Sequence, residues 1–132
     1  MKVEPILGLR GHPSRSRRVN LIGKWRNQHD SEMEISVDLE GTITGSFRTN
    51  VGSPSPGEEF ALVGFCAGDL VSFTVNFGRH GSLATWTGQH NAADGVEKLE
   101  TLWHLARDIR DPERPDDPWA GILAGADTFH RV

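Results

Sequence analysis

Residues 32–39, Glu-Met-Glu-Ile-Ser-Val-Asp-Leu, decide the fold class of this chain. Apolar side chains at positions 33, 35, 37 and 39 alternate with polar side chains at 32, 34, 36 and 38. In an extended strand this period of two places the apolar side chains on one face and the polar side chains on the other. The stretch therefore predicts a half-buried β-strand with one face toward solvent.

Similar apolar stretches recur outward from this one at intervals of roughly ten residues, separated by clusters of Gly, Pro, Asp and Asn. Short turns join antiparallel neighbours, and eight strands are enough for such a meander to close on itself. We therefore predict an all-β fold, an eight-stranded antiparallel up-and-down barrel. A helix is the weaker alternative for 97–107, where the spacing of the apolar residues is ambiguous. The other predicted strands are 21–28, 43–50, 60–66, 70–77, 83–90, 96–106 and 123–131.

The 132 residues are enough for one domain, and the N-terminal residues differ from the rest in composition. Residues 1–20 hold four arginines and little apolar periodicity, so we expect a flexible basic arm ahead of a barrel over 21–132. A contact of this arm with nucleic acid or with an anionic surface remains the alternative. Residues 107–118 form a long connection rich in Asp and Pro, which we interpret as a solvated loop.

Composition excludes several function classes. The formal net charge of −4 does not suit a protein built around a nucleic-acid footprint. A single cysteine, Cys66, rules out an internal disulfide and any multi-cysteine metal site. No stretch approaches the roughly 18 apolar residues that a membrane span needs. The first residues carry no readable export signal, so we expect no membrane partner and leave the localisation open.

The side chains that share the inward parity of the predicted strands are unusual for a barrel core. The chain has four tryptophans and no tyrosine. Trp25 shares a face with Asn27, Trp86 with Ser82, and Phe129 with Asp127. Aromatic walls beside a few polar groups are typical of a small-ligand pocket. The inward faces therefore predict a binding site within the barrel.

Five motifs, in order and with similar spacing, resemble the avidin and streptavidin family. The resemblance covers about residues 21–132 and implies the streptavidin-like barrel, which is a known eight-stranded example holding one small ligand. It also implies non-catalytic binding of biotin, with no metal and no cofactor apart from biotin as the ligand. The motifs are Gly23-Lys24-Trp25-Arg26-Asn27-Gln28, Thr44-Gly45, Trp86-Thr87-Gly88-Gln89, Leu102-Trp103-His104-Leu105, and Trp119 with Asp127-Thr128-Phe129.

The resemblance assigns roles to individual residues. Asn27 and Ser31 would donate hydrogen bonds to the ureido oxygen of biotin. Thr49 and Asp127 would accept from its two N–H groups. The loop after the third strand and Ser82 would meet the carboxylate, and Trp119 would reach the pocket of a neighbouring subunit. The implied biotin-binding set is Asn27, Ser31, Phe47, Thr49, Val51, Gly52, Ser53, Phe77, Ser82, Ala84, Trp86, Trp103, Trp119 and Asp127.

Three positions depart from the family pattern. Phe47 stands where the family usually has Tyr, whose hydroxyl is a third donor to the ureido oxygen. Loss of one such donor typically weakens binding by about 1–3 kcal/mol. Ala84 stands where the family often has Thr, and Phe77 replaces a common Trp. We therefore expect biotin binding that is weaker than that of the tightest family members.

Other functions stay open from the sequence. A barrel of this fold could hold another small heterocyclic ligand or a protein partner. A hydrolase using Asp127 or Cys66 is a further alternative, although no catalytic set is recognisable. The resemblance also implies a homo-oligomer. Because Cys66 cannot supply the internal disulfide common in the family's dimeric branch, a tetramer is favoured over a dimer. The resemblance suggests a secreted or periplasmic protein.

Overall fold

A computed structural model describes residues 19–50, 57–108 and 122–132. These residues form eight β-strands and one short 3₁₀ helix, η1 (Gly78–His80). Each predicted strand is present, with ends that differ from the prediction by a few residues at most. The strands are β1 (Gly23–Asn27), β2 (Glu32–Val37), β3 (Thr42–Arg48), β4 (Glu59–Ala67), β5 (Leu70–Phe77), β6 (Ser82–Asn91), β7 (Lys98–Arg107) and β8 (Ile122–Arg131).

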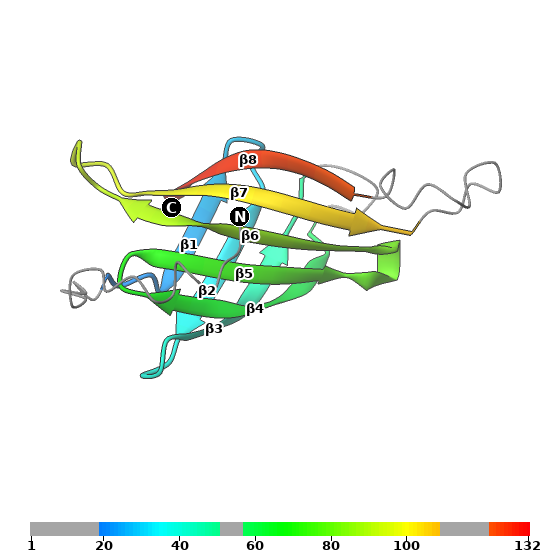
Figure 1. Cartoon of the computed structure of the whole chain (residues 1–132), viewed down its shortest axis with the longest axis horizontal. Helices are drawn as coiled ribbons and strands as arrows, with labels where there is room; N and C mark the ends of the chain where they lie inside the picture. The colour runs from blue at the N-terminus through cyan, green and yellow to red at the C-terminus, as the bar shows by residue number, and fades with distance from the viewer. Residues whose placement is uncertain (1–18, 51–56, 109–121) are drawn as a thin grey trace, which may run out of the picture.

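The strands form a closed barrel in which each one pairs with its neighbour in the sequence (Figure 1). Antiparallel pairing of β8 with β1 closes the sheet, and Asn27 lies opposite Phe129 across this seam. The up-and-down topology predicted from the sequence is thereby confirmed. The ambiguous segment 97–107 is a strand along most of its length, because β7 pairs with β6 over ten residues and with β8 over nine.

The sheet needs glycine where the backbones of neighbouring strands approach each other closely. A Cβ at Gly45 on β3 would collide with the carbonyl oxygen of Glu34 on β2. A Cβ at Gly88 on β6 would collide in the same way with the carbonyl oxygen of Glu100 on β7. Glycine inside a strand commonly marks such close approach of two backbones. These residues therefore permit the curvature that a small closed barrel requires.

One end of the barrel interior is filled by apolar side chains, and we call it the closed end. Trp25, Leu99 and Phe129 are completely buried there. The Trp25 indole N–H donates to the carbonyl oxygen of Leu21 at 2.9 Å, so its one polar atom is satisfied. Arg131 covers the outer surface of this end, with its guanidinium carbon 4.4 Å from the centre of the Trp25 ring.

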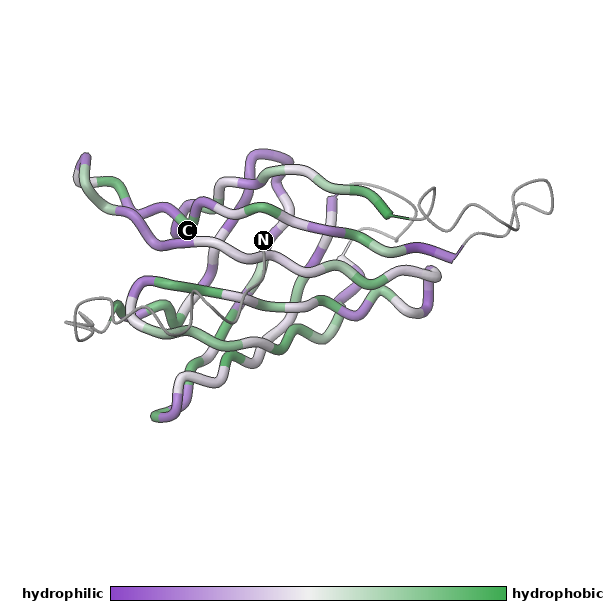
Figure 2. Tube along the Cα trace, in the orientation of Figure 1, coloured by the Kyte–Doolittle hydropathy of each residue, from purple (hydrophilic) through white to green (hydrophobic). Residues whose placement is uncertain are grey.

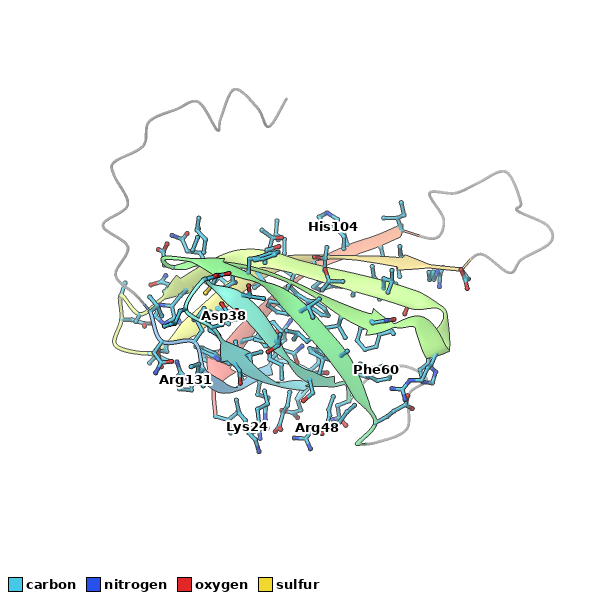
Figure 3. All side chains as sticks on the ribbon, turned by 90° about the horizontal axis from the view of Figure 1, so that it is seen from below. Lys24, Asp38, Arg48, Phe60, His104 and Arg131 are labelled. Carbon is cyan, nitrogen blue, oxygen red and sulfur yellow. The ribbon has the colours of Figure 1, made fainter. Side chains whose placement is uncertain are left out.

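The two outer sides of the barrel differ in polarity. The outer side of β1–β3 carries charged side chains such as Lys24, Glu34 and Arg48. Figure 3 shows Lys24 and Arg48 on one side of the barrel and His104 of β7 on the opposite side. Along β4 both faces are largely hydrophobic (Figure 2). We call the outer side of β4–β7 the apolar face; large apolar side chains exposed on it include Val63, Phe65, Leu70, Leu83 and Leu102.

The predicted N-terminal arm falls almost entirely on residues 1–18, which lie outside the described part of the chain. The same holds for most of the Asp- and Pro-rich connection before β8. Among the residues described, no helix has the length and apolar character of a membrane-spanning segment.

Candidate functional site

A cavity of about 630 Å³ opens at the end of the barrel opposite the closed end. That volume lies within the range of roughly 300–1,000 Å³ typical of small-ligand sites. Residues at the ends of β1, β3, β5 and β7 and at the starts of β6 and β8 surround it. Its lining residues are Asn27, His29, Ser31, Phe47, Thr49, Phe77, His80, Ser82, Ala84, Trp86, Trp103, Leu105, Gly125, Ala126 and Asp127.

Asn27 combines a structural role in the β1–β2 turn with a polar group facing the cavity. Its side-chain oxygen, Oδ1, accepts hydrogen bonds from the backbone N–H groups of His29 and Ser31, both at 3.0 Å. Asparagine favours this local pattern because its short amide can bond the backbone a few residues ahead. These two bonds fix which side of the amide is oxygen. The Nδ2 group therefore faces Asp127, at 3.3 Å, as a donor with a second hydrogen to offer.

Ser31 and Thr49 present a pair of hydroxyl groups beside Asn27. The Ser31 Oγ accepts from the backbone N–H of Asn50 at 3.1 Å and lies 3.4 Å from the Thr49 Oγ1. Because the Ser31 oxygen already accepts, its own proton is available to donate. A ligand oxygen could therefore accept a hydrogen bond from the Ser31 hydroxyl. The Thr49 oxygen could accept a hydrogen bond from a ligand N–H group.

Asp127 is a buried carboxylate held by three N–H donors. The indole Nε1 of Trp86 donates to Oδ2 at 2.8 Å, and Asn27 donates to the same oxygen. The side-chain amide of Gln28 donates to Oδ1 at 3.0 Å. Asp127 is only 5% exposed, and such a buried charge is stable only when its lone pairs are used. The carboxylate is therefore fixed in place as an acceptor at the wall of the cavity.

Gln28 fixes Asp127 from outside the cavity across the β1–β8 seam. Its amide N–H₂ also donates to the carbonyl oxygen of Ala126, and its oxygen accepts from the backbone N–H of Thr128 at 3.0 Å. From β7, the Thr101 hydroxyl donates to the carbonyl oxygen of Asp127 at 2.9 Å. The backbone around Asp127 is thus held on two sides, which limits the movement of its carboxylate.

The aromatic part of the cavity wall is built from rings that support one another. Trp86 stacks on Phe73, with ring centres 5.3 Å apart and planes 13° apart. Phe47 packs against Trp86 at 5.2 Å and meets Phe77 edge-on at 5.8 Å. Rings at such distances interact favourably beyond their buried area. The wall is therefore rigid before any ligand enters.

Trp103 is placed by the absence of a side chain on the neighbouring strand. It lies opposite Gly125 in the pairing of β7 with β8. A Cβ added at Gly125 would overlap the indole ring of Trp103. The ring therefore rests against the bare backbone of β8 and can line the cavity. Any larger residue at position 125 would displace it.

Three polar residues form what we call the rim cluster: Glu58, Arg79 and His80. Glu58 lies just before β4, and the other two belong to η1. The Glu58 Oε2 is 2.8 Å from the His80 Nε2 and 3.3 Å from an Arg79 nitrogen. Arg79 also lies over the Phe60 ring, 4.7 Å from its centre. The cluster joins the β5–β6 connection to the start of β4 at the mouth of the cavity.

Ten residues of the set predicted from the sequence lie in the described part of the chain, and all ten line this single cavity. Val51, Gly52, Ser53 and Trp119 lie outside the described residues. Five lining residues were not in the predicted set. Leu105 shares the inward parity of Trp103 and could have been included, whereas only the closed barrel brings His29 and His80 to the cavity. The unpredicted residues are His29, His80, Leu105, Gly125 and Ala126.

The site is suited to binding rather than to covalent chemistry. Cys66 lies on β4 and is not among the lining residues. Burial raises the pKa of its thiol, and the nearby Asp38 carboxylate raises it further, which disfavours a reactive thiolate. Within the described residues there is no group of three or more His, Cys, Asp or Glu able to hold a metal ion.

Comparison with known proteins gives a consistent result. Residues 15–132 match the family model described as the avidin family. Avidin from Gallus gallus is 30% identical over 127 residues, covering 89% of this chain and 81% of avidin. The crystal structure of xenavidin superposes with a TM-score of 0.74 at 34% identity, covering 86% of this chain and 98% of xenavidin. The rhizavidin–biotin complex superposes with a TM-score of 0.70 at 27% identity, covering 83% and 98%.

Proposed function

The chain belongs to the avidin family, and from this premise we propose that it binds one biotin within its own barrel. Avidin-family proteins are non-catalytic biotin-binding proteins. The chain is accordingly a binding protein and not an enzyme. The ligand, its position in the cavity and its affinity are the subjects of the proposal.

The observation that carries the proposal is the arrangement of donors and acceptors at the inner side of the cavity. A cyclic urea offers one carbonyl oxygen between two N–H groups. Asn27 Nδ2 and the Ser31 hydroxyl can donate to that oxygen, while Asp127 and Thr49 can accept from the N–H groups. Donors around an oxygen and acceptors beside N–H groups polarise the urea, and such bonds reinforce one another in a dry site.

The aromatic wall supports the same ligand. Biotin carries an apolar thiophane ring and an alkyl chain beyond its urea. Trp86, Trp103 and Phe77 line the cavity and would contact these parts. Burial of apolar surface contributes about 25 cal/mol per Å², so the wall supplies affinity while the polar groups supply specificity. Ser82 lies further out and would meet the carboxylate.

The proposal includes an affinity below that of the tightest relatives. Phe47 is buried in the cavity wall and offers no hydroxyl to the ureido oxygen. Ala84 likewise offers no polar atom from its side chain. The same two residues keep open the alternative that the cavity holds a different small heterocycle or that the fold serves a protein partner.

Isothermal titration with biotin, followed by desthiobiotin, tests the proposal directly. We expect saturation near one biotin per chain. Competition with biotin would then displace any other heterocycle that enters the same cavity. Absence of saturation up to millimolar biotin would contradict the proposal and would leave the alternative ligands to be searched.

We further propose that the chain forms a homo-oligomer, with a tetramer favoured over a dimer. The apolar face supports this, because the exposed Val63, Phe65 and Leu102 would be covered by a second copy. The charged outer side of β1–β3 would remain in solvent. Trp119, which lies outside the described residues, would complete a neighbouring site. Size-exclusion chromatography with light scattering measures the assembly, and a monomer at micromolar concentration would contradict this part of the proposal.

A further inference from the structure

The cavity has polar groups at two separate ends, and the rim cluster belongs to the outer one. Trp86 donates to Asp127 at the inner end, whereas Ser82 lies four residues earlier on β6. At about 3.3 Å per residue this separation is roughly 13 Å. His80 immediately precedes this outer part of β6 and lines the same cavity. A ligand that uses both ends must be elongated, with a polar group at each end.

The His80 ring is held with one of its two nitrogens committed to the protein. Its Nε2 lies 2.8 Å from the Glu58 Oε2. Its ring also packs against Phe60, with centres 5.7 Å apart and planes 66° apart. Among the described residues the structure records no hydrogen-bond partner for the other nitrogen, Nδ1. His80 is therefore oriented by the protein and retains one polar atom for a ligand.

The charges around His80 suit an anionic ligand group. Arg79 lies 3.3 Å from Glu58, so the negative charge of Glu58 is already offset before a ligand arrives. A carboxylate beside Nδ1, together with Glu58 beside Nε2, would place an anionic hydrogen-bond acceptor at each nitrogen of the ring. A neutral tail lacks the charge that makes such a bond strong.

We propose that His80, oriented by Glu58, is a specificity-determining residue that binds the carboxylate end of biotin. The site then favours the free acid over biotin whose carboxyl group is tied up in an amide. This inference rests on the proposed function and deepens it. It assigns to the rim cluster the recognition of the ligand's second polar end.

The test is a cycle of two ligands and two proteins, measured by isothermal titration at one pH and one salt concentration. Biotin is compared with biotinamide, which replaces the carboxylate by a neutral amide of similar size. Wild-type protein is compared with His80→Gln, which keeps a polar side chain and removes the imidazole. His130→Gln on the outer face of β8 is the matched control, because it removes an exposed histidine that does not line the cavity.

We expect the wild type to bind biotin about three- to tenfold more tightly than biotinamide, as for a partly exposed charge-assisted hydrogen bond. His80→Gln should lose this preference by weakening the binding of biotin alone, and His130→Gln should keep it. Retained biotinamide binding also shows that the variant is folded. Equal effects of His80→Gln on both ligands, or none on either, would overturn the inference while the proposed function stands. Failure of the wild type to bind either ligand would overturn both.

Discussion

The two ends of the barrel interior use the same strands for opposite purposes. Trp25 and Phe129 face inward at the closed end, and Asn27 and Asp127 face inward at the open end. Trp25 and Asn27 are consecutive inward-facing residues of β1, and Asp127 and Phe129 are consecutive inward-facing residues of β8. The members of each pair are two residues apart, or roughly 6.6 Å. Within this distance, a core of apolar side chains gives way to a buried network of polar side chains.

Stability and ligand recognition are divided between the closed end and the open end of the barrel. The closed end buries large apolar side chains, and this burial stabilises the barrel. The open end buries Asn27, Ser31 and Asp127, which costs free energy unless each is hydrogen-bonded. Within the described residues no buried side-chain nitrogen or oxygen lacks a partner. The polar end is therefore tolerated rather than stabilising. Its polar groups contribute favourable free energy when they bind a ligand.

The same substitution at the two ends gives the largest contrast. Trp25→Ala removes a fully buried ring and should lower the free energy of unfolding by about 3–5 kcal/mol. Trp103→Ala removes a partly exposed ring from the cavity wall and should cost less than half as much, while weakening biotin binding. Urea unfolding followed by circular dichroism measures both. Equal losses of stability would contradict the division between the two ends.

Asp127→Ala should act on binding more than on folding. Removing one partner from a buried, hydrogen-bonded charged site costs about 2–5 kcal/mol of binding free energy, so biotin affinity should fall by at least about thirtyfold. The free energy of unfolding should fall by less, because removal of the buried charge offsets part of the cost of leaving the Trp86 and Asn27 N–H donors without an acceptor. Titration with biotin and urea unfolding give the two values. A variant that binds biotin normally would exclude Asp127 from the site.

Phe47→Tyr should strengthen biotin binding at the open end, because it adds a hydroxyl donor to the cavity wall at position 47. We expect biotin affinity to rise by about 1–3 kcal/mol if the new hydroxyl reaches the ureido oxygen. Phe73→Tyr is the matched comparison, since Phe73 is equally buried but does not line the cavity. It should lower stability by burying a hydroxyl without a partner. Unchanged biotin affinity in Phe47→Tyr would show that position 47 is not beside the urea.

The smallest effect is expected from the ion pair that covers the closed end. Hydrogen bonds from Arg131 and then His90 lower the pKa of Glu97 to about 2, from an ordinary value of 4.5. Because the folded-state pKa is depressed, the stabilisation is complete above about pH 4.5 and is lost as the pH falls toward 2. Glu97 is more than one third exposed, so solvent limits the effect to less than about 1 kcal/mol.

Urea unfolding of the wild type and Glu97→Gln at pH 7 and pH 3 measures this contribution. The wild type should be the more stable protein at pH 7, and the difference should shrink at pH 3. A difference that is independent of pH would mean that Glu97 acts through packing rather than through its charge.

The amino-acid sequence by itself determined the strands, their number and the character of the interior. These features depend on side-chain alternation, which is a property of neighbouring residues. The helix alternative for 97–107 arose because Leu102 and Ala106 are apolar yet face outward in β7. Their outward position weakens the period-two pattern that identified the other strands. The resemblance to the avidin and streptavidin family named ten further residues that the barrel gathers around one cavity.

Only the tertiary structure decided which polar groups meet. Gln28 and Thr128 are 100 residues apart, Trp86 and Asp127 are 41 apart, and Glu58 and His80 are 22 apart. Such contacts depend on the register of every strand pair and on the closure of β8 against β1. A change of one residue in any register would turn the inward side chains of that strand outward. The spacing of residues along the chain does not predict these registers. The hydrogen bonds that fix Asp127 and orient His80 could therefore be identified only from the closed barrel.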